Sequence, residues 1–197
     1  MKRVIGIVGS YRKGGVVDTA LSAVLASAAE NGAETVKHYL LDKDIKFCTN
    51  CRECMQTPGP ERGKCVLDDD MEALLQNIET ADSLVIGSPV NFNNVTAIMR
   101  TFMERCVGHV YWPWGIEKPL ARTPGLGKKV VLVSASSAPA RMGRTFKDAM
   151  NALQYTANII GAHSVGQLCI DRVNKEHMEL SGKVLRKAMQ LGRKLTR

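Results

Sequence analysis

Short apolar runs alternate along the chain with longer segments in which apolar residues recur every three or four positions. Two of the runs, VIGIV at 4–8 and LVIG at 84–87, contain no polar side chain, which is typical of strands buried on both faces. The pattern predicts strands at residues 4–8, 35–41, 83–87, 129–134 and 164–170, and helices at 20–30, 71–80, 94–106, 143–161 and 175–195.

This alternation of strands and helices favours a parallel sheet covered by helices on both faces. Five strands in about 200 residues fit a flavodoxin-like α/β fold, a three-layer sandwich with the strand order 2-1-3-4-5. We expect one domain over residues 1–197, with a cysteine-rich loop inserted at about 47–66. Ligands of such sheets bind beyond the carboxyl ends of the strands, so the loops after strands one, three and four are the candidates.

Composition narrows the choice of partners. Apolar residues make up 45% of the chain and aromatic residues 5%, which predicts an aliphatic core. The formal charge is +8, and many of the basic residues fall between 183 and 197, where they fit a solvated helix face. The alternative is attraction to an anion such as a phosphate-bearing cofactor. Nucleic acid is not expected as a partner, because the aromatic residues are not interleaved with the charge.

We expect a cytoplasmic protein with no membrane partner. The basic opening is followed by an apolar run, 4–8, that is too short for a signal peptide. No segment approaches the roughly 20 apolar residues that a membrane span needs.

The loop after the first strand, GSYRKGG at 9–15, leads into a helix N-terminus, where backbone N–H groups and the helix dipole favour an anion. Ser10, Arg12 and Lys13 add donors and positive charge, and Gly14 permits a tight turn. The loop matches neither a Walker A motif nor Gly-x-Gly-x-x-Gly, so a phosphate monoester fits better than a pyrophosphate. The alternative is an ordinary glycine turn with exposed basic residues.

The loop after the third strand is rich in asparagine, which suits a flat heterocycle with a polar edge. Asn93 or Asn94 can serve instead as a helix cap, but a cap accounts for only one of them. The loop after the fourth strand is built from small residues that allow a ligand to approach closely. The candidate ligand-binding residues of these two loops are Ser88, Pro89, Val90, Asn91, Phe92, Asn93, Asn94 and Val95, and then Ser134, Ala135, Ser136 and Ser137.

Three motifs in this order, GSYRKGG, CTNCREC…CVLDDDM and SPVNFNNVTAIMRTFMER, resemble the NADPH-dependent FMN reductase and iron–sulfur flavoprotein family over residues 2–134. The resemblance implies a flavodoxin-like fold that binds FMN. It matches Ser10, Arg12 and Lys13 to the phosphate loop. It matches 88–95 to the loop beside the isoalloxazine, and 134–137 to the loop on the other side of the flavin.

The chain departs from the family pattern at two places. Val16 and Val17 stand where relatives often have hydroxyl or amide side chains, so phosphate binding falls to Ser10, Arg12 and backbone N–H groups, with help from Thr19. Asn91 and Phe92 replace a common Tyr-Phe pair, which affects the flavin potential or the shape of the substrate site.

Four cysteines form the spacing Cys-x2-Cys-x2-Cys-x10-Cys: Cys48, Cys51, Cys54 and Cys65. Such turns bring sulfurs together, as in the ligands of a ferredoxin [4Fe–4S] cluster. The alternatives are a four-thiolate zinc site and free or disulfide-forming thiols near the flavin. Iron–sulfur members of the family have a shorter last gap. Cys106 and Cys169 are expected to be core residues.

The resulting functional hypothesis is an FMN-dependent oxidoreductase that takes electrons from NAD(P)H and reduces a small acceptor, such as a quinone or a flavin. NAD(P)H use is implied by the resemblance alone. One alternative is an electron-transfer iron–sulfur flavoprotein whose partner is an electron-carrier protein, and another is a non-redox regulatory or thiol-binding domain. No side chain is assigned as a catalytic acid or base, because the chemistry belongs to FMN.

We expect a homo-oligomer, a dimer or a tetramer. For Tyr111, Trp112 and Trp114 three roles stay open: roofing the flavin, forming a dimer contact, or packing locally.

Overall fold

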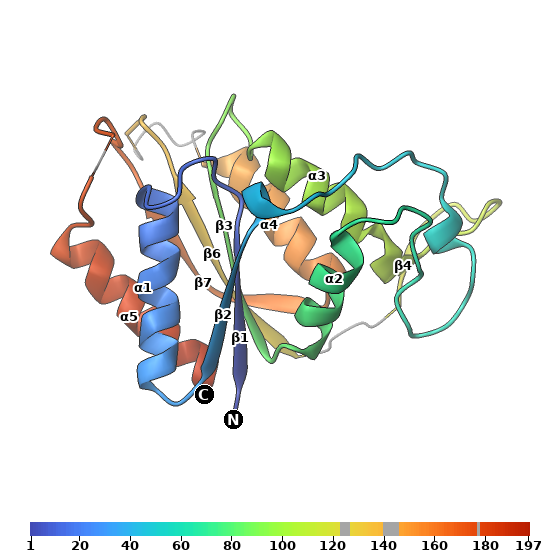
Figure 1. Ribbon diagram of the computed structural model, residues 1–197, viewed down its shortest axis with the longest axis horizontal. Coiled ribbons are helices and arrows are strands. Elements are labelled where there is room, and N and C mark those ends of the chain that lie inside the picture. Colours follow the sequence, from blue (N-terminus) through green and yellow to red (C-terminus); the bar gives the residue numbers. More distant parts are fainter. Residues whose placement is uncertain (123–126, 140–145, 177) are drawn as a thin grey trace.

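The computed structural model describes residues 1–122, 127–139, 146–176 and 178–197 (Figure 1). In these ranges a five-stranded parallel sheet has the order β2-β1-β3-β6-β7. Because β6 and β7 are the fourth and fifth strands of this sheet along the chain, the predicted order is confirmed. The strands are β1 (Arg3–Val8), β2 (Glu34–Tyr39), β3 (Ser83–Pro89), β6 (Lys128–Ala135) and β7 (Ala162–Ile170), and a separate ribbon pairs β4 (Val110–Tyr111) with β5 (Leu120–Ala121).

Helices cover both faces of the sheet, as the pattern predicted. On one side lie α1 (Val16–Glu30) and α5 (Gly182–Thr196). On the other side lie α2 (Met71–Thr80), α3 (Ala97–Arg105) and α4 (Lys147–Ile159) (Figure 1). Three short 3-10 turns complete the described elements: η1 (Leu40–Asp42), η2 (Glu53–Met55) and η3 (Cys106–His109).

The interior strand β1 shows why the run at 4–8 contains no polar side chain. Ile5 and Ile7 pack into the core beneath α2, α3 and α4, while Val4 and Val8 pack into the core beneath α1 and α5. Successive side chains of a strand point to opposite faces, so a strand with helices on both sides needs apolar residues throughout.

Two helices, α3 and α5, begin later than periodicity suggested, because hydroxyl caps fix their starts. The Thr96 side chain accepts a hydrogen bond from Met99 N–H, so α3 begins at Ala97 and the prediction of Asn93 or Asn94 as the cap is wrong. Ser181 likewise caps α5 through Val184 N–H, so α5 begins at Gly182, seven residues after the expected start at 175. Residues 143–145 of the expected fourth helix lie outside the described ranges.

The two cysteines expected in the core differ. Cys106 is fully buried, as expected, and burial raises the pKa of its thiol to about 12. Cys169 is exposed, so its prediction is wrong. The reason is that β7 is an edge strand, on which some positions face solvent.

No helix in the described part of the chain has both the length and the apolar character that crossing a bilayer demands.

The packing of α1 against α5 generates a prediction at Gly192. A Cβ there would lie 2.4 Å from the Val24 carbonyl oxygen and 2.7 Å from Ser27 Cβ, and neither atom can move easily. We expect Gly192→Ala to lower the free energy of unfolding by about 1–3 kcal/mol, measured by urea denaturation. Gly182→Ala on the same helix is the control, because its Cβ would approach only the flexible Arg186 side chain, at 3.4 Å. Equal effects of the two changes would contradict the prediction.

Candidate functional site

The three loops singled out by the topology meet at one cavity of about 410 Å³ beyond the carboxyl ends of β1, β3 and β6. This is the switch point of the sheet, where β1 lies between strands whose connections run in opposite directions. All three loops contribute lining residues: Ser10, Tyr11, Arg12 and Gly15 from the first, Pro89, Val90, Asn91 and Thr96 from the second, and Ala135, Ser136 and Ser137 from the third.

Two predicted ligand residues, Ser88 and Ser134, lie beneath this cavity and do not line it. Both are fully buried. The Ser134 hydroxyl donates to the Ser88 carbonyl oxygen at 2.9 Å, and the Ser88 hydroxyl accepts from Thr96 N–H at 3.1 Å. Thr96 Oγ1 donates to the Gly9 carbonyl oxygen at 2.7 Å. The hydroxyls therefore join the ends of β1, β3 and β6, and sequence reasoning missed Thr96 at the centre of this network.

The phosphate loop presents Ser10 and Arg12 to the cavity. Ser10 Oγ accepts a hydrogen bond from Arg12 N–H at 3.1 Å, which shapes the turn. The Arg12 side chain is exposed, and the ion pairs found within the described ranges leave it out. Its charge is therefore available to an anionic ligand.

The structure places Lys13, Gly14 and Thr19 outside the cavity lining. Lys13 Nζ pairs with Asp42 Oδ1 at 2.6 Å. Gly14 has a φ of 73° and donates its N–H to Asp18. The Thr19 hydroxyl donates to the Gly14 and Gly15 carbonyl oxygens at 3.2 and 3.1 Å, so it turns back on its own helix.

The segment after β7 also lines the cavity, through Val173, Lys175 and Glu176. Hydrogen bonds from Ser136 N–H to the Ile170 carbonyl oxygen, 2.9 Å, and from Val173 N–H to the Ser136 carbonyl oxygen, 3.0 Å, hold it there. Sequence reasoning missed these residues because it assigned 175 to a helix. The carboxyl-edge rule applied to the fifth strand was the available signal.

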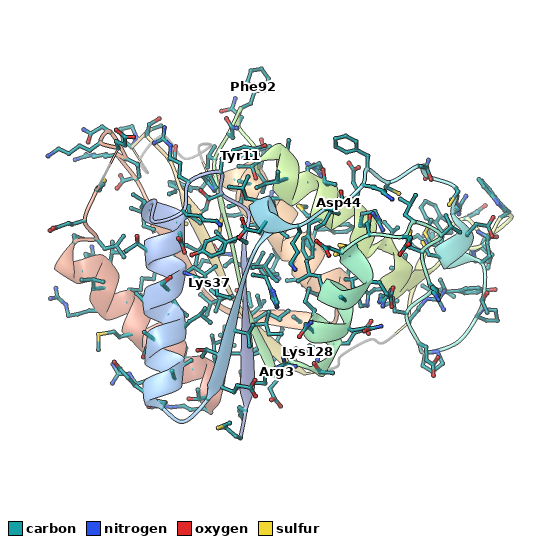
Figure 2. The ribbon with its side chains drawn as sticks, in the orientation of Figure 1. Arg3, Tyr11, Lys37, Asp44, Phe92 and Lys128 are labelled. Carbon is teal, nitrogen blue, oxygen red and sulfur yellow. The ribbon has the colours of Figure 1, made fainter. Side chains whose placement is uncertain are left out.

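The asparagine-rich loop is a two-residue hairpin that projects from the molecule (Figure 2). Asn91 and Asn94 exchange backbone hydrogen bonds at 2.7 and 3.0 Å. Phe92 and Asn93 between them have φ values of 49° and 61°. The Phe92 side chain is fully exposed, at 102%, and Val95 enters the core. Of the four residues from Phe92 to Val95, the cavity lining includes none.

The four clustered cysteines line a second cavity of about 450 Å³, beside α3 and α4. The lining also includes Arg52, Arg105 and Trp112, and it shares no residue with the first cavity. Burial raises the pKa of the Cys54 thiol to about 11, and the neighbouring Cys65, Cys48 and Cys51 add to the shift.

These thiols have the donor chemistry of a cluster site but not its finished geometry. Across the described ranges, no three side chains of the types His, Cys, Asp and Glu are arranged to hold a metal ion. What the structure shows is four thiols that line one cavity, which is the donor type of a cluster site.

Aromatic and charged side chains fix the cysteine loop. Arg52, whose φ is 64°, lies over the Trp112 and Trp114 rings at 4.6 and 4.0 Å from their centroids. This places the two tryptophans at the cysteine loop rather than at the first cavity. At the other end of the loop, Asp69 forms a buried ion pair with Arg105. Burial would raise the pKa of the Asp69 carboxyl, but hydrogen bonds from Arg105 and two backbone N–H groups hold it below its usual value.

Comparison with known proteins finds the family that the sequence motifs resemble. A family model described as NADPH-dependent FMN reductase matches residues 2–177. An iron-sulfur flavoprotein of Archaeoglobus fulgidus is 36% identical over 111 residues, which cover 56% of this chain and 48% of that protein. An iron-sulfur flavoprotein of Methanocaldococcus jannaschii is 37% identical over 103 residues, 52% of this chain and 51% of that protein. The chain thus spans about half the length of these curated relatives.

Solved structures share the fold. An azoreductase from Bacillus anthracis superimposes with a TM-score of 0.69 at 16% identity, covering 100% of this chain and 99% of the other. An NAD(P)H:quinone oxidoreductase from Methanothermobacter marburgensis gives a TM-score of 0.68 at 15% identity, covering 100% and 98%. The flavodoxin-like fold is therefore confirmed.

The hairpin tip yields a stability prediction. A bulky residue with positive φ is strained, and glycine is not. We expect Phe92→Gly to raise the free energy of unfolding by about 1 kcal/mol in urea denaturation. Phe92→Ala is the control: it removes the ring but keeps Cβ, so it retains the strain. A loss of stability in Phe92→Gly would show that the ring itself supports the turn.

Proposed function

The chain belongs to the NADPH-dependent FMN reductase family, whose model matches residues 2–177, and from this premise we propose that it is an NAD(P)H-dependent FMN oxidoreductase. FMN occupies the switch-point cavity, and the acceptor is a small molecule such as a quinone or a free flavin. The observation that carries the proposal is the convergence of all three predicted loops on that one cavity.

The phosphate of FMN fits the end of the cavity formed by the first loop. Arg12 supplies the positive charge, and Lys175 on the segment after β7 adds a second cation. Val16 and Val17 offer apolar side chains, so the donors left at the start of α1 are their backbone N–H groups, which have no partner inside the helix. Phosphate binding thus depends on cationic side chains and backbone N–H groups, because the start of α1 offers no side-chain hydroxyl at Val16 and Val17.

The ring of FMN fits the end formed by the other two loops. The small side chains of Ala135, Ser136 and Ser137 leave space for a flat ring, and the Asn91 amide is a hydrogen-bonding group at its edge. Bound FMN supplies the redox chemistry, accepting a hydride from NAD(P)H and passing electrons to the acceptor. The chain binds and orients it, and no protein acid or base is assigned.

Flavin titration followed by fluorescence tests this proposal. We expect wild-type protein to bind FMN and to oxidise NADPH in the presence of a quinone. Arg12→Ala should weaken FMN binding by about 10–100-fold, because a charge-assisted hydrogen bond to phosphate is lost. Lys13→Ala, the adjacent control, should change it by less than about 3-fold, since Lys13 is paired with Asp42. Wild-type protein that binds no flavin would overturn the proposal.

A second candidate, an electron-transfer iron–sulfur flavoprotein, is favoured by a separate observation. Cys48, Cys51, Cys54 and Cys65 line one cavity together with two arginines. A cubane held by four thiolates is anionic, so the cation of Arg52 complements it, whereas the charge of Arg105 is balanced by Asp69. The curated relatives are named iron-sulfur flavoproteins. The four thiolates would hold a [4Fe–4S] cluster, which accepts one electron at a time, and an electron-carrier protein would be the partner.

Iron and acid-labile sulfide in protein purified without oxygen test the cluster. We expect about four iron per chain, as a cubane requires. Cys54→Ser should remove most of the iron while FMN binding persists, because the two cavities share no lining residue. Cys169→Ser is the control, since Cys169 is an exposed residue of β7. Iron-free wild-type protein would reject the cluster and leave the reductase with free thiols.

The remaining expectations extend the same proposal. We place the protein in the cytoplasm as a homo-oligomer, a dimer or a tetramer, with residues 1–197 as one domain and 47–66 as its insertion. Two exposed aromatic side chains, Tyr11 in the cavity lining and Phe92 at the tip of the projecting hairpin, support association between chains.

A further inference from the structure

A nearly inaccessible carboxylate lies just beneath the phosphate loop. Asp18, in the first turn of α1, is 3% exposed. It accepts hydrogen bonds from Gly14 N–H at 2.7 Å, from Lys37 Nζ at 2.8 Å and from the Tyr39 hydroxyl at 3.0 Å. Burial would raise the pKa of this carboxyl, but these three donors hold it below the usual value. Asp18 is therefore an anion at neutral pH.

This charge stands at the helix end that is proposed to receive a phosphate. Two anions there repel each other and compete for the same dipole. Lys37 resolves the conflict, because its ammonium neutralises Asp18 within a partly buried ion pair. Figure 2 shows Lys37 on β2, on the side of that strand that faces α1. Lys37 does not line the cavity and lies outside the GSYRKGG loop, so neither of these features identifies it as part of the site.

Asp18 also decides which backbone donors face the ligand. Its Oδ2 binds the N–H of Gly14 and holds the left-handed turn there, where φ is 73°. Gly15 N–H is used by the Arg12 carbonyl oxygen at 3.3 Å. The N–H groups of Arg12, Gly14 and Gly15 are thus taken, whereas those of Val16 and Val17 at the start of α1 have no partner inside the helix.

Tyr39 connects Asp18 to β2, the strand at the edge of the sheet. Its hydroxyl binds Asp18, and its ring lies 4.8 Å from Lys37 Nζ and 5.1 Å from Lys13 Nζ. The Lys13–Asp42 pair adds an exposed tie from the same loop to η1. The phosphate loop is in this way fixed to the carboxyl end of β2.

We propose that Asp18, Lys37 and Tyr39 are positioning residues that make the site selective for the phosphate of FMN over flavin without phosphate. The inference rests on the proposed function, since it concerns the same cavity. Asp18 sets the turn, Tyr39 holds it, and Lys37 removes the charge that would otherwise repel the phosphate. Selectivity, not flavin binding as such, depends on them.

The test compares dissociation constants for FMN and riboflavin by fluorescence quenching. Lys37→Met leaves Asp18 unneutralised, so it should weaken FMN binding by about 10-fold or more and riboflavin binding by less than about 2-fold. Asp18→Asn combined with Lys37→Met keeps an acceptor for Gly14 N–H without the charge, so FMN affinity should return to within about 3-fold of wild type. Lys2→Met, at the opposite end of the sheet, controls for the loss of one positive charge.

The outcomes separate the two proposals. Wild-type protein that binds neither flavin would overturn the proposed function, and this inference with it. Wild-type binding with no change in Lys37→Met, or with equal weakening for both flavins, would overturn this inference alone, because a purely structural role does not distinguish the phosphate. If Lys37→Met does not fold, the comparison moves to the neutral double variants. Asp18→Ala/Lys37→Met, which lacks the acceptor, should then bind FMN more weakly than Asp18→Asn/Lys37→Met, with riboflavin unaffected, and equal FMN affinity would overturn the inference.

Discussion

The hydroxyl of Thr96 holds the carboxyl ends of β1 and β3 together, and the candidate flavin site depends on that contact. Where parallel strands end, buried backbone groups lose their ladder partners and need others. Thr96 Oγ1 serves the Gly9 carbonyl oxygen at 2.7 Å, and Ser134 Oγ serves the Ser88 carbonyl oxygen at 2.9 Å. With these groups satisfied internally, the next residues of each loop, among them Arg12, Asn91 and Ser136, are left to face the cavity.

Contacts between distant parts of the chain explain which residues of the candidate site could not be identified from the sequence. Apolar runs and the switch-point rule were enough for the sheet order and for the choice of loops. Ser88 and Ser134 were assigned to the ligand because small polar residues after a strand suit binding, yet both still belong to their strands and point into the protein. Lys13 pairs with Asp42, a contact between distant positions that no local pattern contains. Lys175 was hidden in an expected helix that starts only at Gly182.

The net charge of the chain does not show which cationic side chains are available to a ligand. The chain carries a formal +8, and several of its cationic side chains are paired with carboxylates. Arg62 pairs with Glu72 and Glu79, Arg105 pairs with Asp69, and Lys37 pairs with Asp18. Among the described residues that line the two cavities, the cations outside these ion pairs are Arg12 and Lys175 at one cavity, where Glu176 also lies, and Arg52 at the other. The sequence offered two explanations of the basic composition, a solvated helix face and attraction to an anion. Choosing between them for a given residue requires knowing which carboxylate, if any, it pairs with.

The cysteine loop shows how tertiary packing compensates for spacing. Ten residues separate Cys54 from Cys65, a longer gap than in the iron–sulfur members that the sequence resembles. Gly63 closes this gap, because a Cβ there would fall 1.7 Å from the Cys54 carbonyl oxygen, so only glycine lets the two strands of the loop touch. Arg122 then binds the carbonyl oxygens of Cys54, Gly59 and Gly108. These contacts bring Cys65 into the lining of the cavity that also contains the other three cysteines. The ten-residue gap is therefore compatible with a site shared by all four.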